Sequence, residues 1–372
     1  MTILRTNTIA GIGSDGAGTV LGGSFSFTSQ NYVILPKGTT GDRVGVGSTP
    51  GALRYNTDSS KVELYDGSQW TEVQSSRPDL NGGARGVFGG GTPAFNVIDY
   101  ATISSTGNAI DFGDLTQSRA EGAALSSQTR GVWTGHSVPG AGGNTMDFVT
   151  ISSTGNAVSF GNLTTTIRQS MGGGANSTRG IWAGGYAVPG GRVNTIEYIT
   201  IATTGNAQDF GDLTTATSAP ISAASSTRCV FAGGSTPADN NTIEFITIST
   251  LGNSADFGDL TRTDHSMASV TNATRAVFAS GGAKTNTLDF ITIATLGNAQ
   301  DFGDLNRTNT YAMSSASSST RGVFSGGGYP SSTNEMSYIT ILTVGNAIDF
   351  GDLTLSRSLM MRGICSNAHG GL

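Results

Sequence analysis

Hydrophobic residues from residue 85 to the C-terminus fall into short runs separated by Gly, Asn, Ser and Pro. One unit illustrates the pattern with four runs: Ser222–Ser226, Arg228–Phe231, Thr242–Phe245 and Asp256–Leu260. Runs this short, bounded by turn residues and rich in aromatic and β-branched side chains, are typical of strands. Apolar segments of helical length with a 3.6-residue period do not occur. The pattern therefore predicts an all-β protein with four short strands in each unit.

The stretch Asp-Phe-Gly-Asp-Leu recurs six times, with one Ser-Phe-Gly-Asn-Leu variant. Its central residues are Phe112, Phe160, Phe210, Phe257, Phe302 and Phe350, which lie 45–50 residues apart. A Gly-Asn pair begins five residues before each Phe, and a further aromatic residue precedes that Gly by seven residues in every unit. Fixed spacing indicates fixed register, because a one-residue slip turns every side chain to the other face. Six units of four strands are the sequence sign of a six-bladed β-propeller.

The ends of the repeat array predict how the propeller closes. Residues 77–84 are too short for the small-residue strand that opens each later unit, and they contain Pro78. One extra strand, about Leu359 to Asn367, follows the last copy. We expect this C-terminal strand to pair with the first Arg-Gly-Val-Phe strand, near Arg85 to Gly90, and so to complete the first blade. Closure of this kind removes exposed sheet edges.

The units resemble kelch repeats. Val230–Gly234 matches the aromatic-ended kelch strand with its Gly-Gly pair, Thr242–Phe245 matches the following strand, and Phe257 stands where kelch units have Trp. All six units carry Phe at that position. The resemblance implies a six-bladed kelch-like β-propeller over residues 77–372.

Residues 1–76 lack the repeat and are expected to form a separate, small β-rich region. Strand-like runs occur at Ser24–Thr28, Tyr32–Pro36, Gly51–Asp58 and Val62–Trp70. Asp66-Gly67 predicts a tight hairpin turn. Residues 71–80 are the expected linker.

This N-terminal region resembles the N-terminal and neck regions of tail fibres and related virion proteins of tailed bacteriophages. The matching elements are Arg54–Thr57 and Tyr65–Trp70, and the opening Ile3–Ile9 and the segment Gln30–Thr40 are similar to those of cyanophage structural proteins. The Gly-Asn-Ala and Asp-Phe-Gly-Asp-Leu repeats also resemble those of cyanophage fibre proteins. The resemblance implies a virion protein without fixing its place in the virion.

Composition excludes several classes of function. The formal net charge is −6, and only Lys37, Lys61 and Lys284 are lysines. An acidic chain so poor in Lys is not expected to bind nucleic acid, whose phosphates need a basic surface. No apolar run approaches membrane-spanning length, and no signal peptide is expected at the N-terminus. Two cysteines, Cys229 and Cys365, predict synthesis in a reducing compartment, here the host bacterial cytoplasm.

Charged residues recur at fixed places in the units. One column is acidic and contains Asp99, Asp147, Glu197, Glu244 and Asp289, with Ser337 in the last unit. A second column contains Arg85, Arg130, Arg179, Arg228, Arg275 and Arg321. These columns either pair along a channel for anions or hold each blade to its neighbour. We favour the structural interpretation, because near-identical copies are what blade packing requires.

The sequence predicts neither an enzyme nor a metal site or cofactor. His136, His265 and His369 lie in different kinds of segment and form no ligand pattern. The glycine-rich stretches lack the helix and Lys of a phosphate-binding loop. A glycan-cleaving depolymerase would need two carboxylates about 5–10 Å apart in a cleft, and no such pair is evident.

Length varies mainly in one loop of each unit, at 89–95, 134–143, 183–193, 232–240, 279–285 and 325–333. Loops on a rigid scaffold commonly carry function. The receptor-face candidates in or near these loops are Phe95, His136, Tyr186, Arg192, Asp239, Lys284 and Tyr329. Aromatic and polar side chains of this kind suit sugar or protein surfaces.

The resulting hypothesis is a non-catalytic virion protein, a tail fibre whose propeller loops bind a host-surface glycan or protein. Residues 1–76 would contact other virion or tail proteins, and analogy with tail fibres suggests a homotrimer, so that avidity strengthens attachment. The alternative is a virion decoration or adaptor protein in which the propeller is a hub for protein binding. The host, the receptor and the position on the virion stay open at this point.

Overall fold

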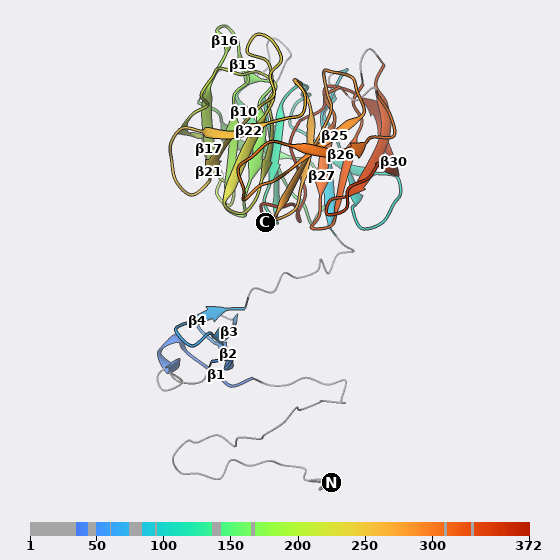
Figure 1. The fold of residues 1–372 in the computed structure, drawn as a ribbon. Coiled ribbons are helices and arrows are strands. Elements are labelled where there is room, and N and C mark those ends of the chain that lie inside the picture. Colours follow the sequence, from blue (N-terminus) through green and yellow to red (C-terminus); the bar gives the residue numbers. More distant parts are fainter. Residues whose placement is uncertain are drawn as a thin grey trace, which may run out of the picture. The chain divides into compact units, whose positions relative to one another are not determined.

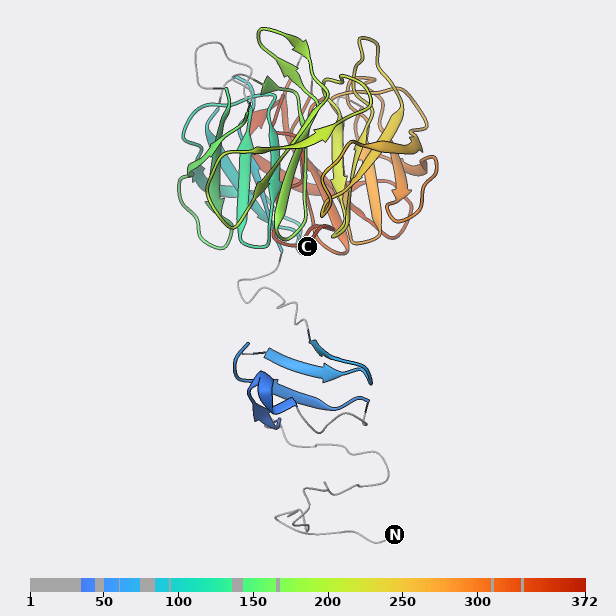
Figure 2. The ribbon, with the colours of Figure 1, turned by 90° about the vertical axis from the view of Figure 1, so that its left-hand side faces the viewer.

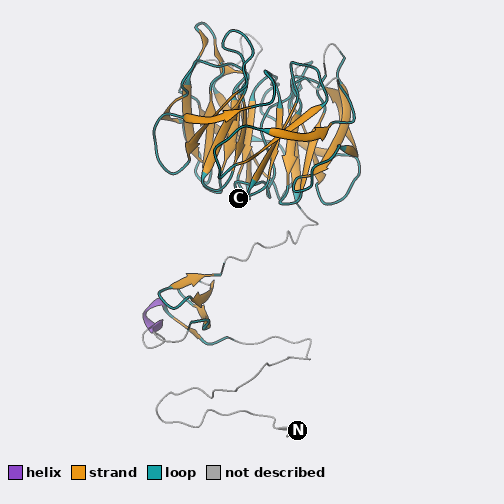
Figure 3. Ribbon diagram, viewed as in Figure 1, coloured by secondary structure: helices purple, strands orange, loops and turns teal. Residues whose placement is uncertain are grey.

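The computed structural model describes residues 35–43, 50–59, 61–73, 84–93, 95–135, 143–164, 168–308, 311–328 and 331–372. The described residues form strands and turns, with one short 3₁₀ helix and no α-helix (Figure 3). The predicted all-β fold is therefore confirmed. None of the described helices is long and apolar enough to cross a membrane. The chain divides into two compact units, Met1–Arg77 and Pro78–Leu372.

The first unit contains one four-stranded sheet in the order β1-β2-β3-β4. Its elements are β1 (Lys37–Gly38), the 3₁₀ helix (Thr40–Arg43), β2 (Leu53–Asn56), β3 (Lys61–Tyr65) and β4 (Trp70–Glu72). Strand β1 is parallel to β2, and the other pairs are antiparallel. Of the strands predicted before residue 50, Ser24–Thr28 and most of Tyr32–Pro36 lie outside the described residues.

The predicted hairpin at Asp66-Gly67 is confirmed between β3 and β4. The Asp66 carboxylate accepts hydrogen bonds from the backbone N–H groups of Ser68 (2.7 Å) and Gln69 (2.8 Å). Gly67 has a φ of 104°, which a residue without Cβ adopts at little cost. An aspartate that bonds its own turn in this way fixes the register of the two strands.

The described part of the second unit contains a small three-stranded sheet of β12 (Arg168–Gln169), β15 (Tyr186–Ala187) and β16 (Gly191–Arg192). Its other sheets are five four-stranded antiparallel sheets and one larger three-stranded sheet, each ordered as in the sequence (Figure 1). The larger three-stranded sheet is β5 (Arg85–Gly89), β6 (Val97–Thr102) and β7 (Ile110–Asp114). The next two are β8 (Ala123–Ser126), β9 (Arg130–Thr134), β10 (Thr145–Thr150) and β11 (Val158–Asn162), and β13 (Gly172–Ala175), β14 (Arg179–Ala183), β17 (Thr195–Thr200) and β18 (Gln208–Asp212). Then come β19 (Ile221–Ala224), β20 (Arg228–Ala232), β21 (Thr242–Thr247) and β22 (Ala255–Asp259), and β23 (Ala268–Thr271), β24 (Arg275–Ala279), β25 (Thr287–Thr292) and β26 (Gln300–Asp304). The last is β27 (Ser314–Ser317), β28 (Arg321–Ser325), β29 (Thr333–Thr340) and β30 (Ile348–Arg357).

The first strand of each four-stranded sheet is buried along its whole length. These strands contact one another in chain order, β8 with β13, then β19, β23 and β27, and β27 also contacts β5. Small residues permit this approach: a Cβ on Gly173 would lie 2.5 Å from the carbonyl oxygen of Ala124. The sheets consequently stand side by side (Figure 2).

The repeated Gly-Asn pairs join neighbouring sheets. In each unit the Gly N–H donates to the carbonyl of the Phe in the preceding sheet, and the Asn side chain accepts from a backbone N–H two residues beyond that Phe. The first pair, Gly107 and Asn108, bonds in the same way to the last sheet, at Phe350 (2.8 Å) and Asp352 (3.1 Å). This bonding between sheets could not be predicted from the fixed spacing of the Gly-Asn pair, which indicates only the register within a unit.

The C-terminal segment lies against β5, where the sequence places it. Ser366 forms an antiparallel bridge with Gly86, and the Val87 N–H donates to the Cys365 carbonyl (2.9 Å). The segment is not a regular strand, since it also bridges in parallel to Ala123 and Ser315 of β8 and β27. It therefore fills the position between those two buried strands.

Six further backbone hydrogen bonds connect the residues that precede the buried strands. They are Ser170 to Glu121, Ala219 to Ser170, Ser266 to Ala219, Ala312 to Ser266, Met360 to Ala312 and Glu121 to Leu359, each written from N–H to carbonyl, with lengths of 2.6–3.2 Å. The six acceptor residues share a φ of 48–57°, in the left-handed region that few residues with a Cβ adopt. A single backbone conformation is thus repeated in each sheet.

Candidate functional site

Two of the predicted receptor-face residues, Tyr186 and Arg192, lie in a small extra hairpin. Strands β15 (Tyr186–Ala187) and β16 (Gly191–Arg192) pair with each other, and β15 also pairs with β12 (Arg168–Gln169). The hairpin projects from the end of the unit at the top of Figure 1. The Tyr186 side chain is 39% exposed. The sequence indicated only a long loop here, because a two-residue strand leaves no periodic signal.

Arg192 connects this hairpin to the next variable loop. Its guanidinium donates to the Ser235 carbonyl (2.9 Å) and to the Ser235 hydroxyl (3.2 Å). Two hydrogen bonds from one guanidinium group fix the relative position of the loops 183–193 and 232–240.

Asp239 connects the second loop to the following sheet. Its carboxylate lies 2.9 Å from the Nδ1 atom of His265, whose ring contacts the Tyr311 ring edge to face at 5.8 Å between centroids. No motif in the sequence assigns a role to His265, which stands apart from the variable loops in the chain. The structure therefore brings Tyr186, Arg192 and Asp239 into one continuous surface together with His265.

Of the other receptor-face candidates, Phe95 and Lys284 lie in different loops. The Phe95 carbonyl accepts a hydrogen bond from the Arg119 N–H (3.1 Å). Phe95 is half-buried, and this bond anchors the loop 89–95. Lys284 occupies a turn with a φ of 56°, and its N–H donates to Gly281 (3.0 Å). His136 and Tyr329 lie outside the described residues.

The arginines that begin β5, β9, β14, β20, β24 and β28 are structural. Each guanidinium lies 4.2–4.7 Å from the centroid of the aromatic ring on the adjacent strand, a cation–π geometry. Each also donates to the carbonyl of an Ile in the next sheet, as Arg179 does to Ile248 (2.6 Å). The same aromatic ring packs edge to face on the recurring Phe, 5.9 Å away for Tyr100 and Phe112. These arginines therefore hold neighbouring sheets together and do not pair with the acidic column.

The acidic column pairs with arginines that lie outside the predicted arginine column. The four pairs are Arg119 with Asp147 (3.1 Å), Arg168 with Glu197 (2.7 Å), Arg262 with Asp289 (2.8 Å) and Arg357 with Asp99 (2.6 Å). Burial lowers the pKa of the Arg168 guanidinium, which the Glu197 carboxylate opposes. Three of these arginines follow the Leu of the repeated Asp-Phe-Gly-Asp-Leu stretch by four or five residues, a spacing that could have identified them.

The sheet β19–β22 contains an acidic-column residue, Glu244, but no arginine at the position that would pair with it. The backbone carbonyls of Arg119, Thr217 and Arg357 each accept a hydrogen bond from a Gly N–H, that of Gly91, Gly185 and Gly327 respectively, at 2.7–2.8 Å. Thr217 therefore stands where the other two sheets have an arginine. Glu244 accepts hydrogen bonds from the Thr214 N–H and hydroxyl and from the Ser254 hydroxyl (2.7 Å). Its residue is 8% exposed, against 0–1% for the four paired acids.

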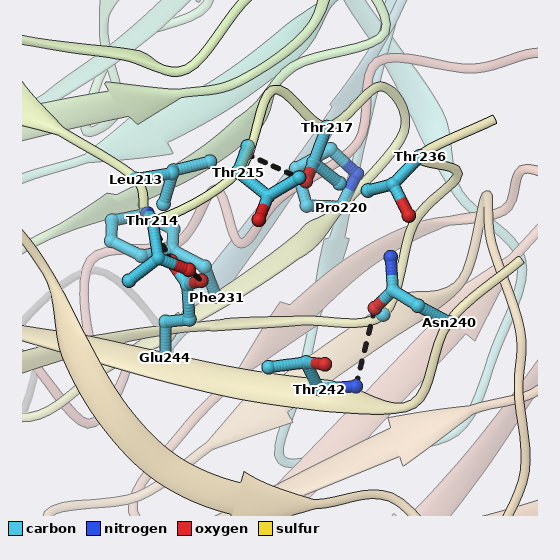
Figure 4. Close-up of a pocket in the computed structure, with 11 residues that line it drawn as sticks. Leu213, Thr214, Thr215, Thr217, Pro220, Phe231, Thr236, Asn240, Thr242 and Glu244 are labelled. Carbon is cyan, nitrogen blue, oxygen red and sulfur yellow. Dashed lines mark hydrogen bonds between the residues drawn. The ribbon is translucent and has the colours of Figure 1, made fainter.

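A cavity of about 90 Å³ occupies the place of the missing side chain (Figure 4). Its walls include Glu244, Thr217, Gly233, Thr242 and Asn240. Polar and apolar groups both line the cavity, which has room for several water molecules.

The described residues contain no group of three or more His, Cys, Asp or Glu that could hold a metal ion. Cys229 and Cys365 are free and buried, and burial raises the pKa of both thiols. A thiol held protonated in this way is a packing group with little reactivity.

Comparison with known proteins gives a likeness in fold only. No family model matches the chain, and no curated protein matches it. Among solved structures 334 chains match, and one of them is the structure of YjhT, with a TM-score of 0.55 and 10% sequence identity. That match covers 66% of this chain and 86% of the YjhT chain. At this identity the similarity concerns the all-β architecture and carries no function.

Proposed function

We propose that residues 77–372 form a closed, six-bladed kelch-like propeller whose variable loops bind a partner surface without catalysis. Two sets of bonds support closure: the Gly-Asn bonds, which pass from the last sheet to the first, and the six backbone bonds that return from Leu359 to Glu121. The C-terminal segment would then supply the fourth strand of the first blade, β5–β7.

The observation that carries the binding role is the bonding between variable loops. Arg192 joins the β15–β16 hairpin to Ser235, and Asp239 in that second loop joins His265. Loops fixed to one another lose little conformational entropy when they bind, which favours recognition. Tyr186 adds a rigid and partly exposed ring to this surface.

The virion role rests on the resemblance of residues 1–76 to phage tail-fibre and neck regions. In this proposal the first unit attaches the protein to other virion or tail proteins, and the propeller binds a host-surface glycan or protein. Several copies, arranged as a homotrimer, would strengthen weak single contacts. The protein would act in the virion after assembly in the host bacterial cytoplasm.

The test is binding of the full chain to intact cyanobacterial cells, compared with Tyr186→Ala and Leu251→Ala variants. Leu251 is a matched control, because it is 54% exposed and lies at the connection that follows β21, at the opposite end of the strands from the variable loops. We expect Tyr186→Ala to weaken cell binding roughly tenfold, the loss typical of an interface aromatic. Unchanged binding by Tyr186→Ala argues against the recognition surface.

A second candidate function is the adaptor hub, favoured by exposed apolar side chains. Leu251, Leu296 and Val344 stand at the same position of three successive sheets, directly before the Gly-Asn pair, and are 54–56% exposed. Exposed apolar groups gathered on one side are typical of protein-binding surfaces. If Leu251→Ala abolishes incorporation into virions while Tyr186→Ala has no effect, the adaptor role replaces receptor binding.

A further inference from the structure

The repeated sheets provide an internal template for the cavity beside Glu244. In the preceding sheet, Arg168 donates to three acceptors: the Gly184 carbonyl (2.6 Å), the Thr195 carbonyl (2.5 Å) and the Glu197 carboxylate (2.7 Å). Arg357 likewise donates to the Gly90 and Val97 carbonyls (3.0 Å each) and to Asp99 (2.6 Å). A glycine carbonyl, a strand carbonyl and a carboxylate thus form the cradle for a guanidinium group.

The cavity keeps this cradle. Gly233, Thr242 and Glu244 occupy the positions of Gly184, Thr195 and Glu197, and all three line the cavity. The short Thr217 side chain does not reach them, and its hydroxyl donates to the Thr215 carbonyl (2.9 Å). Figure 4 shows Thr217 and Glu244 at opposite ends of the open space. The sheet β19–β22 therefore has the three acceptor groups of a guanidinium site but no arginine side chain between them.

We propose that this cavity is a binding site for a guanidinium group supplied from outside the chain, as an arginine side chain or a small guanidine compound. The carboxylate supplies the charge, and the partial exposure of Glu244 gives access to it. A guanidinium group is planar and has five N–H donors, so it can bond to acceptors on several sides at once. A single ammonium group does not match this arrangement. Four of the other sheets place an arginine guanidinium against the acidic-column carboxylate, and none of these four uses a lysine.

The cavity is continuous with the proposed recognition surface. Thr236 and Asn240 line it, and both belong to the loop 232–240 that carries Asp239. An arginine of a bound partner could therefore enter beneath this loop. The site does not depend on the virion role, because its evidence is the acceptor geometry alone.

The test measures binding of methylguanidinium to the full chain by NMR titration, with methylammonium as the comparison cation. We expect saturable binding of methylguanidinium that shifts the amide signals of Thr214 and Thr242, and at least tenfold weaker binding of methylammonium. Glu244→Gln should weaken binding at least about tenfold, since a bond to a charged acceptor is lost. Thr217→Arg should abolish it by filling the cavity from within.

The matched control is Asp259→Asn, which removes a carboxylate from β22 that does not line the cavity. It should leave the affinity unchanged.

Tighter binding of a Gly-Arg-Gly peptide than of methylguanidinium identifies a partner's arginine as the source, and equal binding identifies a small guanidine compound. The proposal is overturned if the wild-type chain shows no saturable binding, if it does not distinguish the two cations, or if Glu244→Gln binds equally well. Since Glu244→Gln keeps the side-chain shape, it remains informative if Thr217→Arg does not fold.

Discussion

Buried arginine side chains are rare in proteins unless a carboxylate accompanies them. Arg119, Arg168 and Arg357 have no exposed surface in this chain, and each has an acid within 3.1 Å. A buried pair of this kind adds little net stability, but loss of one partner leaves an uncompensated charge. The pairs therefore restrict which residues these positions accept.

This restriction predicts that a Glu→Gln substitution lowers the free energy of unfolding by different amounts in two neighbouring sheets. Glu197→Gln should lower the free energy of unfolding by about 3–5 kcal/mol, because Arg168 stays buried without its counter-charge. Glu244→Gln should cost at most about 1.5 kcal/mol, since only hydroxyl and amide donors face it. Urea denaturation of both variants measures the difference. Equal costs would show that the cavity does not lack a cation.

His369 is a buried histidine whose hydrogen bonds require the neutral ring. Its Nε2 atom donates to the Ser126 carbonyl (2.8 Å), and Nδ1 accepts from the Gly371 N–H (3.1 Å). Burial lowers the pKa of His369 from 6.5 to about 4. The unfolded chain therefore binds a proton between pH 6.5 and about 4 that the folded chain does not.

This pKa difference makes stability fall as the pH is lowered. At about pH 5.5 the contribution of His369 should be roughly 1.4 kcal/mol smaller than at about pH 7.5, and the loss should continue until about pH 4. His369→Gln has no ring to protonate, so its free energy of unfolding should decline less across the same range. Parallel pH profiles for the two proteins would contradict this assignment.

At the scale of elements, the repeated Gly of Asp-Phe-Gly-Asp-Leu packs directly against the next sheet. Gly161 has a φ of 154°, and a Cβ there would lie 2.1 Å from the Gly205 carbonyl oxygen. Gly155 has a similar φ of 152°, but a Cβ there meets nothing within 4 Å. The two positions share backbone strain and differ in steric contact.

Alanine substitution separates these two effects. Gly161→Ala should lower the thermal unfolding midpoint more than Gly155→Ala does, because its Cβ forces the sheets apart at an added cost of about 1–3 kcal/mol. Gly155→Ala carries only the conformational penalty. Equal midpoints for the two variants would mean that the contact between sheets yields easily.

The sequence predicted the strands well because alternation and fixed spacing encode them directly. The Arg-Gly-Val-Phe arginines and the Asp66-Gly67 turn follow from local chemistry and were placed correctly. The Arg168 pair with Glu197 was missed, since its partners lie 29 residues apart and meet only in the folded sheet. The contact of Asp239 with His265 was missed for the same reason, because no periodic signal connects a loop to another sheet.

At the scale of the whole unit, the C-terminal segment is the element whose removal should matter most. A chain ending at Ser358 loses the contacts of Cys365 and Ser366 with β5, and those of His369 with β8. We expect a lower urea midpoint and a smaller m-value, because less surface is buried cooperatively. A chain lacking only Leu372 is the control. Coincident unfolding curves for the full and the truncated chains would argue against the proposed closure.

The position of this segment also has a consequence for biosynthesis. Asn367 lies 282 residues after Arg85, yet its side chain bonds the Arg85 backbone. At a translation rate of ~5–20 residues per second, β5 emerges from the ribosome roughly 14–56 s before its partner exists. During that time the nascent chain carries an unpaired strand edge, a template for wrong association. The protein thus depends on holding the sheet β5–β7 apart from other chains until Asn367 has been made.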